Sequence, residues 1–266
     1  MKLSIVVSTQ PASFSAVAFK GQLDENIAKI KNLGYDGVEL AVRDPKLLDI
    51  NALKSLLSTH SLPVSAIGTG QAYGEEGLSF THPNANIRSK AIKRIQSQMR
   101  LAAEFDAVVI IGLVRGKKSS EVSDEQTEEW FIQALTECAL ENTNVKLAIE
   151  MINRYETDLL NTVTSGLSFL EKINVNNVGL HLDTFHMNIE EPSITKSILT
   201  AKEKLFYFHV ADSNRWYPGA GHIDFGTIVN TLNEVGYNGF VSAEILPLPD
   251  PDTAAIETIK YMREFI

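Results

Sequence analysis

Val178-Gly-Leu-His-Leu-Asp-Thr-Phe-His-Met-Asn-Ile-Glu-Glu191 is the stretch that decides the fold. It begins as a short apolar strand and presents Asp183 and His186 where that strand should run out. Three other stretches share this form, an apolar strand that ends in a side chain able to bind a metal ion: residues 146–150, 205–209 and 240–244. The strand-end side chains are 33, 26 and 35 residues apart, about one strand and one helix per interval.

The rest of the chain continues this alternation. Compact apolar runs predict eight strands, at 3–7, 37–42, 63–67, 107–111, 146–150, 178–183, 205–210 and 239–245. Apolar residues at helical spacing predict eight helices, at about 23–33, 50–60, 87–105, 123–141, 164–173, 193–201, 225–235 and 253–265. Strict alternation predicts the α/β class with a parallel sheet, and eight units predict one closed (β/α)8 TIM barrel domain over residues 1–266. A doubly wound open sheet is the alternative, but it would not gather the ends of strands five to eight around one point.

The composition of the chain limits the kinds of partner and the cell compartment that we expect. The chain is 44% hydrophobic and 21% charged, as in soluble globular proteins with a large core. A net charge of −9 argues against nucleic acid or an anionic membrane as a partner. Cys138 is the single cysteine, so no intrachain disulfide can form. The apolar runs are shorter than the roughly 18 residues that cross a membrane, and we expect a cytoplasmic protein.

Taken together, the strand-end side chains form a mixed oxygen and nitrogen ligand set without a thiolate: Glu150, Asp183, His209 and Glu244. Such a set suits one divalent ion, which could be Mn²⁺, Mg²⁺, Co²⁺ or Zn²⁺. For any single residue, capping of a strand or loop is the simpler explanation. Four residues at the same place in consecutive units favour a metal site, because the C-terminal strand ends converge at the mouth of a barrel.

Two candidates for substrate contact lie just beyond strand ends. His186 could be a fifth ligand, could support a ligand, or could donate a hydrogen bond to substrate; we favour substrate contact over a loop histidine bound to backbone. Arg215 could clamp a hydroxyl, carboxylate or phosphate, or be a solvated loop arginine. His181, two residues before Asp183, shares that side of the strand and is interpreted as a filler of the barrel interior.

Two glutamates are further candidates, each with a simpler alternative. Glu156 lies in the loop after the fifth strand, within reach of the mouth, but it could equally pair with Arg154 on the surface. Glu39 lies within the second strand and could reach the site or pair with Arg43.

Basic residues follow the fourth strand at Arg115, Lys117 and Lys118. At the barrel mouth they could bind the phosphate of a sugar phosphate, or they could form an exposed basic loop. The polar, glycine-rich segment 68–86 is too long for a simple turn and is predicted to be a functional loop.

Leu182-Asp-Thr-Phe-His-Met-Asn-Ile-Glu-Glu191 resembles the corresponding segment of the ketose 3-epimerases of the tagatose and psicose type. The segments Asn153-Arg-Tyr-Glu-Thr157 and Pro218-Gly-Ala-Gly221 are also similar to that family. The resemblance implies metal binding by Glu150, Asp183, His209 and Glu244, and substrate contact by His186, Glu156 and Arg215. The wider group is the xylose isomerase-like TIM barrel superfamily. The resemblance covers the whole chain as architecture and is specific from about Glu150 onward.

This resemblance implies a divalent-metal-dependent isomerase or epimerase of a sugar or sugar phosphate. The ion would polarise the substrate carbonyl. One of Glu150 and Glu244 would remove the neighbouring proton, and the other would return a proton to the opposite face of a metal-stabilised cis-enediolate. Members of the family are often dimers or tetramers, so a homo-oligomer is expected.

Three other functions are alternatives to this one. A lyase resembling the inosose dehydratases would use the same proton abstraction and lose a hydroxyl. A non-catalytic sugar-binding barrel would not need the full ligand set. A hydrolase resembling the AP endonucleases would need further histidines after strands three and four, and residues 66–69 and 110–113 contain none.

Overall fold

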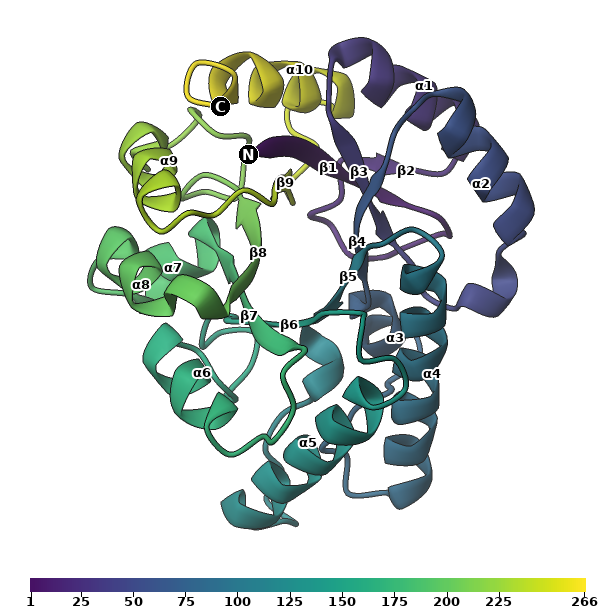
Figure 1. The fold of residues 1–266 in the computed structure, drawn as a ribbon, viewed down its shortest axis with the longest axis vertical. Helices are drawn as coiled ribbons and strands as arrows, with labels where there is room; N and C mark the ends of the chain where they lie inside the picture. The colour runs from purple at the N-terminus through teal and green to yellow at the C-terminus, as the bar shows by residue number, and fades with distance from the viewer.

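The computed structural model describes all 266 residues, Met1–Ile266, and confirms the predicted TIM barrel (Figure 1). Its parallel strands are arranged in the order β2-β1-β3-β4-β5-β6-β7-β8-β9, and β1 also pairs with β9, which closes eight of them into a barrel. The strands are β1 (Lys2–Ser8), β2 (Phe19–Lys20), β3 (Gly37–Ala41), β4 (Val64–Gly68), β5 (Val108–Ile111), β6 (Leu147–Glu150), β7 (Val178–Asp183), β8 (Leu205–Val210) and β9 (Phe240–Ala243).

All eight predicted helices are present. They surround the barrel on its outside, as Figure 1 shows. They are α1 (Leu23–Leu33), α2 (Ile50–Thr59), α4 (Ala85–Ala103), α5 (Asp124–Ala139), α6 (Val163–Leu170), α8 (Ile194–Ala201), α9 (Phe225–Glu234) and α10 (Pro251–Met262). Most begin at a residue whose side chain accepts a backbone N–H, such as Asp49 before α2 and Ser123 before α5. Gly34 ends α1 with a left-handed φ of 93°, which glycine adopts without strain.

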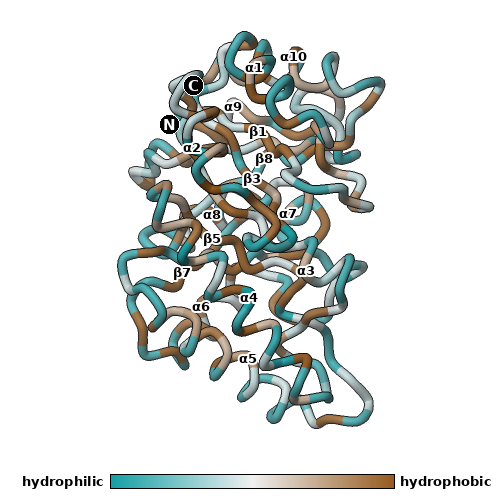
Figure 2. The backbone as a smooth tube through the Cα atoms, turned by 90° about the vertical axis from the view of Figure 1, so that its right-hand side faces the viewer, coloured by the Kyte–Doolittle hydropathy of each residue, from teal (hydrophilic) through white to brown (hydrophobic).

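The strands of the barrel are among the most deeply buried parts of the chain. Every residue of β3, β6 and β7 is buried, as continuous apolar runs in a parallel sheet require. Figure 2 shows hydrophobic segments along the strands and hydrophilic segments on the outer turns. None of the helices combines the length and the apolar character that crossing a bilayer requires.

One short strand and two short α-helices were not predicted, and the two helices lie at the mouth of the barrel. The two-residue strand β2 extends the sheet beside β1, inside a segment expected to be a loop. Helix α3 (Gly70–Gly74) lies within the predicted loop 68–86, and α7 (Thr184–Glu190) follows β7 without a gap. In the edge-on view of Figure 2, α3 and α7 lie on the same side of the barrel.

The alternative that was not favoured for His186, a loop histidine bound to backbone, is therefore wrong, because His186 lies in α7. The reason is local. Asp183 ends β7 and also begins α7, since its Oδ1 accepts a hydrogen bond from the Phe185 N–H at 2.7 Å.

The chain also contains three 3₁₀ turns, which are η1 (Pro45–Leu47), η2 (Leu113–Arg115) and η3 (Lys202–Lys204).

Candidate functional site

Four predicted ligands meet at the C-terminal mouth of the barrel. They come from the ends of four consecutive strands, β6 to β9, and each offers one ligand atom within 4.8 Å of the others: Glu150, Asp183, His209 and Glu244. Asp183 and His209 are register partners across β7 and β8. Three of the four are buried, and the side chain of Glu244 is 16% exposed.

Two of these atoms lack any partner within the protein. Asp183 Oδ2 and His209 Nδ1 are buried without a hydrogen bond, and they lie 3.8 Å apart. A buried polar atom without a partner is costly. Metal–ligand bonds of about 2.0–2.2 Å can place two ligand atoms of one ion at this separation. The donor set and the unpaired atoms therefore fit one divalent cation.

The other nitrogen of His209 is occupied. His209 Nε2 lies 2.7 Å from Glu39 Oε2, which also accepts a hydrogen bond from the Tyr207 hydroxyl at 3.0 Å. Tyr207 is in turn 2.7 Å from the Ser65 hydroxyl. Glu39 thus reaches the site and does not pair with Arg43, and its carboxylate binds a candidate ligand, His209, at the edge of the cavity. A carboxylate on the remote nitrogen holds a metal-binding imidazole with its free nitrogen toward the ion.

The two candidate catalytic glutamates differ in acidity. Burial raises the pKa of Glu244 to about 7, against the attraction of His209 and Arg215. Burial also acts to raise the pKa of Glu150, but the neighbouring histidines, first among them His181 and His186, outweigh it and hold the pKa below its usual range. The environment of Glu244 therefore favours the protonated carboxyl, and that of Glu150 favours the ionised carboxylate.

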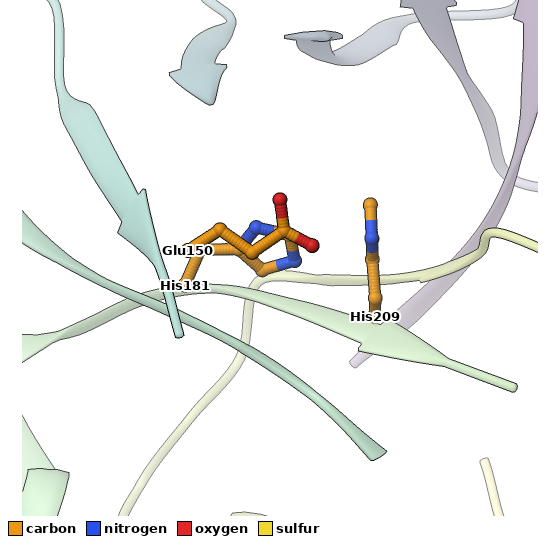
Figure 3. Close-up of side chains that lie close together, drawn as sticks. All are labelled: Glu150, His181 and His209. Carbon is orange, nitrogen blue, oxygen red and sulfur yellow. The ribbon is translucent and has the colours of Figure 1, made fainter. Parts of the chain in front are cut away.

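His181 lies closer to the ligands than expected of a filler. Glu150, His181 and His209 offer ligand atoms within 4.8 Å of one another. Figure 3 shows the side chains of Glu150 and His181 lying over each other and pointing toward the ring of His209. The rings of His181 and His209 meet edge to face at 4.1 Å, and both nitrogens of His181 are buried without a partner. Burial lowers the pKa of His181 to about 3, so this ring is charged only below that pH and is neutral near pH 7.

Arg215 joins two glutamates. Its Nη1 donates to Glu156 Oε1 at 3.0 Å and its Nη2 donates to Glu244 Oε2 at 2.9 Å. The guanidinium carbon also lies 5.2 Å from the centroid of the Phe14 ring and 4.8 Å from that of the Phe185 ring, within the range of cation–π contacts. The alternative of a solvated loop arginine is therefore wrong, because only 12% of the side chain is exposed.

Glu156 is likewise directed to the site rather than to the surface. The alternative partner, Arg154, pairs with Glu190 at 2.8 Å. Glu156 Oε1 accepts from Arg215 and also from Asn153 Nδ2 at 3.1 Å. His186, from α7, completes this side, with its Nε2 3.5 Å from Glu150 Oε1.

These side chains surround a cavity of about 320 Å³, in the range of small-molecule sites. Every predicted site residue lines it except Asp183, which lies deeper, and Arg115. The walls also include Phe14 from the loop after β1 and Gln71 from α3. Neither was predicted, because nothing in the spacing of their segments indicates the direction in which a loop folds over a barrel.

The prediction that Arg115 binds a substrate phosphate is corrected by its surroundings. The side chain is fully buried and donates to backbone carbonyl groups, including those of Gly112 at 3.0 Å, Leu159 at 3.1 Å and Glu150. The N–H groups of its guanidinium therefore bind the backbone at the ends of β5 and β6 and in the loops that follow them, and do not face the cavity. Of its basic neighbours, Lys118 pairs with Asp124 at 2.5 Å, and neither lysine lines the cavity.

Known proteins resemble this chain over most of its length. The family described as xylose isomerase-like TIM barrel matches residues 27–265. A D-psicose 3-epimerase of Agrobacterium fabrum is 43% identical over 231 residues, which are 82% of this chain and 77% of the relative. An L-ribulose 3-epimerase of Methylomonas sp. is 32% identical over 222 residues, 82% of this chain and 76% of the relative.

A solved structure has the same fold. The crystal structure of a D-allulose 3-epimerase from Methylomonas sp., in complex with D-allulose, superposes with a TM-score of 0.83 at 25% identity. The match covers 100% of this chain and 97% of that chain. These similarities confirm the resemblance that the segments around Glu150 and Asp183 indicate.

Proposed function

The chain belongs to the xylose isomerase-like TIM barrel family, and we propose that it epimerises an unphosphorylated ketose beside the carbonyl with the help of one divalent metal ion. It is an isomerase or epimerase acting on sugars, as are the relatives matched above. The observation that carries the finer proposal is the position of two glutamates, Glu150 and Glu244. Their carboxylates converge on one cavity, and the strands of Asp183 and His209 lie between theirs.

We assign the ion to the four strand-end residues, whose donor set and unpaired atoms fit it: Glu150, Asp183, His209 and Glu244. When bound, a divalent cation supplies Lewis acidity that polarises a carbonyl and makes the adjacent C–H more acidic. It would also balance the local charge. Glu39, which binds His209, and Glu156, which binds Arg215, add two carboxylates to those of the ligands, whereas Arg215 is the one arginine that lines the cavity.

Proton transfer falls to the two glutamates. Glu150 ends β6 and Glu244 follows β9, and two strands of the barrel lie between them, so they approach the cavity from different directions. One carboxylate removes the proton from the carbon beside the carbonyl, which leaves a planar enediolate. The other glutamate, in its carboxylic acid form, donates its proton to the opposite face, which inverts that carbon and leaves the two glutamates with exchanged protonation states. No atom is lost, and the substrate and the product have the same mass.

The polar groups on the other side of the cavity orient the sugar. His186 presents its Nε2 toward Glu150, and Arg215 presents its guanidinium beside Glu244. Both can donate hydrogen bonds to hydroxyl oxygens, and Glu156 can accept one. Holding the reacting carbon between the two carboxylates lowers the entropic part of the barrier.

The cavity favours a sugar without phosphate. Arg215 is the one arginine that lines it, no lysine does, and its two terminal nitrogens are engaged by glutamates. A phosphate here would meet carboxylates without a free arginine or lysine side chain to bind it, which is unfavourable in a partly buried site. We therefore choose the free ketose from the two alternatives that the sequence left open.

The test is hydrogen exchange into the substrate. The protein is incubated in D₂O with Mg²⁺ or Mn²⁺ and a panel of ketoses and ketose phosphates, and NMR and mass spectra are recorded. We expect deuterium at one carbon of a free ketose together with its epimer, and neither without the ion. Exchange confined to phosphorylated sugars would contradict the choice of substrate, and a product lighter by one water would indicate a lyase.

A further inference from the structure

Asn153 connects the polar groups on the substrate side of the cavity. It is buried in the turn after β6, and its Nδ2 lies 2.7 Å from His186 Nδ1 and 3.1 Å from Glu156 Oε1. Glu156 in turn binds Arg215. The amide of Asn153 therefore connects His186 to the pair formed by Glu156 and Arg215, the three groups that would hold the sugar.

The orientation of this amide is set without reference to His186. Asn153 Oδ1 accepts a hydrogen bond from the Tyr155 N–H at 3.0 Å, which forms a local turn of the kind that asparagine favours. An ionised Glu156 only accepts hydrogen bonds, so the atom facing it must be the NH₂ group. Rotating the amide by 180° would place oxygen against a carboxylate and NH₂ against a backbone N–H. Both neighbours therefore require the observed orientation.

We propose that Asn153 is a positioning residue that holds His186 as the Nε2–H tautomer, so that this imidazole presents a hydrogen-bond donor to the substrate. Because the amide donates to Nδ1, that nitrogen must carry a lone pair. The remaining proton of the ring lies on Nε2, which faces Glu150 across the cavity at 3.5 Å. The inference rests on the proposed function only in naming the acceptor, an oxygen of the sugar.

One influence opposes this arrangement. Burial acts to lower the pKa of His186, but the nearby Asp183 and Glu150 outweigh it and raise the pKa. A second proton would have to sit on Nδ1, where it would point at the NH₂ group of Asn153.

The tautomer can be observed directly. Long-range ¹H–¹⁵N spectra of the ¹⁵N-labelled full chain, loaded with diamagnetic Mg²⁺ and without sugar, distinguish protonated from unprotonated ring nitrogens. The signals of His186 are identified by their loss in His186→Gln. We expect His186 with its proton on Nε2 and none on Nδ1. A proton on Nδ1 in the unmodified protein would overturn the proposal, and this outcome needs no variant at position 153.

Asn153→Asp reverses the hydrogen bond while preserving the shape of the side chain. Its carboxylate can still accept from the Tyr155 N–H, but toward His186 it offers an acceptor, which draws a proton to Nδ1. We expect the His186 spectrum to change accordingly. On a ketose that the unmodified protein converts, kcat of Asn153→Asp should be about 10–100-fold lower, the range for residues that orient an active group. KM should change less. Asn153→Ala should give a mixture of tautomers.

Asn161→Asp is the matched control. Asn161 lies in the same loop, and its Nδ2 donates only to backbone carbonyl groups, those of Ile152 at 2.7 Å and Thr157 at 2.9 Å. This variant should leave the His186 spectrum unchanged. An unchanged His186 spectrum in Asn153→Asp would refute the positioning role even if the protein epimerises ketoses. A changed spectrum in a protein that acts on no ketose would refute the proposed function and leave the positioning role intact.

Discussion

Glu39 and His209 are 170 residues apart in the chain, yet Glu39 Oε2 lies 2.7 Å from His209 Nε2 inside the barrel. The pair leaves Nδ1 of the imidazole unpaired, 3.8 Å from the equally unpaired Oδ2 of Asp183. One carboxylate therefore determines which nitrogen of His209 is free for an ion.

Removing the acceptor at position 39 should weaken metal binding. In Glu39→Leu, the N–H of His209 and the hydroxyl of Tyr207 lose their shared acceptor, so the imidazole is no longer held in the ligand orientation. We expect an affinity for Mg²⁺ or Mn²⁺ lower by about 10–100-fold, measured by calorimetric titration. Glu39→Gln keeps an acceptor oxygen and should lose less. Equal losses in the two variants would argue against an orienting hydrogen bond.

Glu150→Gln and Glu244→Gln should each lose nearly all turnover. An amide can neither take up nor return the proton, and a general acid or base contributes typically about 10²–10⁴-fold to the rate. The measurement is kcat on the ketose identified by deuterium exchange. The control is Glu190→Gln, which removes a carboxylate that pairs with Arg154 outside the cavity. Near-normal turnover in either glutamate variant would refute the assignment.

Metal uptake should weaken as the pH falls through about 7. Burial raises the pKa of Glu244 to that value in the metal-free protein. Above it the carboxylate is ionised and free to bind, whereas below it a proton must leave first, so this group should lower the apparent affinity by about tenfold per pH unit. Calorimetry in buffers of different ionisation enthalpy counts the protons released. Glu244→Gln should release one proton fewer, and an equal number would contradict the prediction.

Arg115→Met should destabilise the protein through its backbone. The variant leaves several buried carbonyl groups in the loops after β5 and β6 without a donor, and each such group costs about 1–3 kcal/mol. Urea unfolding should therefore show a loss of about 3 kcal/mol or more. Lys118→Met, in the same loop but exposed, should stay within about 0.5 kcal/mol. If Arg115 instead bound substrate, its replacement would raise KM and leave the free energy of unfolding unchanged.

The sequence alone determined the architecture and the metal-type residues. Apolar runs, helical spacing and caps are local properties, so they indicate each strand and helix without knowledge of the rest. Eight alternating units have few ways to bury their apolar faces other than a closed barrel. Barrel closure then places the C-terminal strand ends together, and this is why Glu150, Asp183, His209 and Glu244 could be assigned before any coordinates were known.

Only the tertiary structure decided what the neighbouring side chains do. The sequence indicates that Arg115 is a basic loop residue, but the loops after β5 and β6 fold over it, and their carbonyl groups accept its hydrogen bonds. Glu39 could pair with Arg43 nearby, yet barrel closure brings it to His209. Asn153 has no local mark of function until α7 places His186 beside it. Such contacts join residues tens to more than a hundred positions apart, and their partners depend on how loops cross the mouth, which no local pattern encodes.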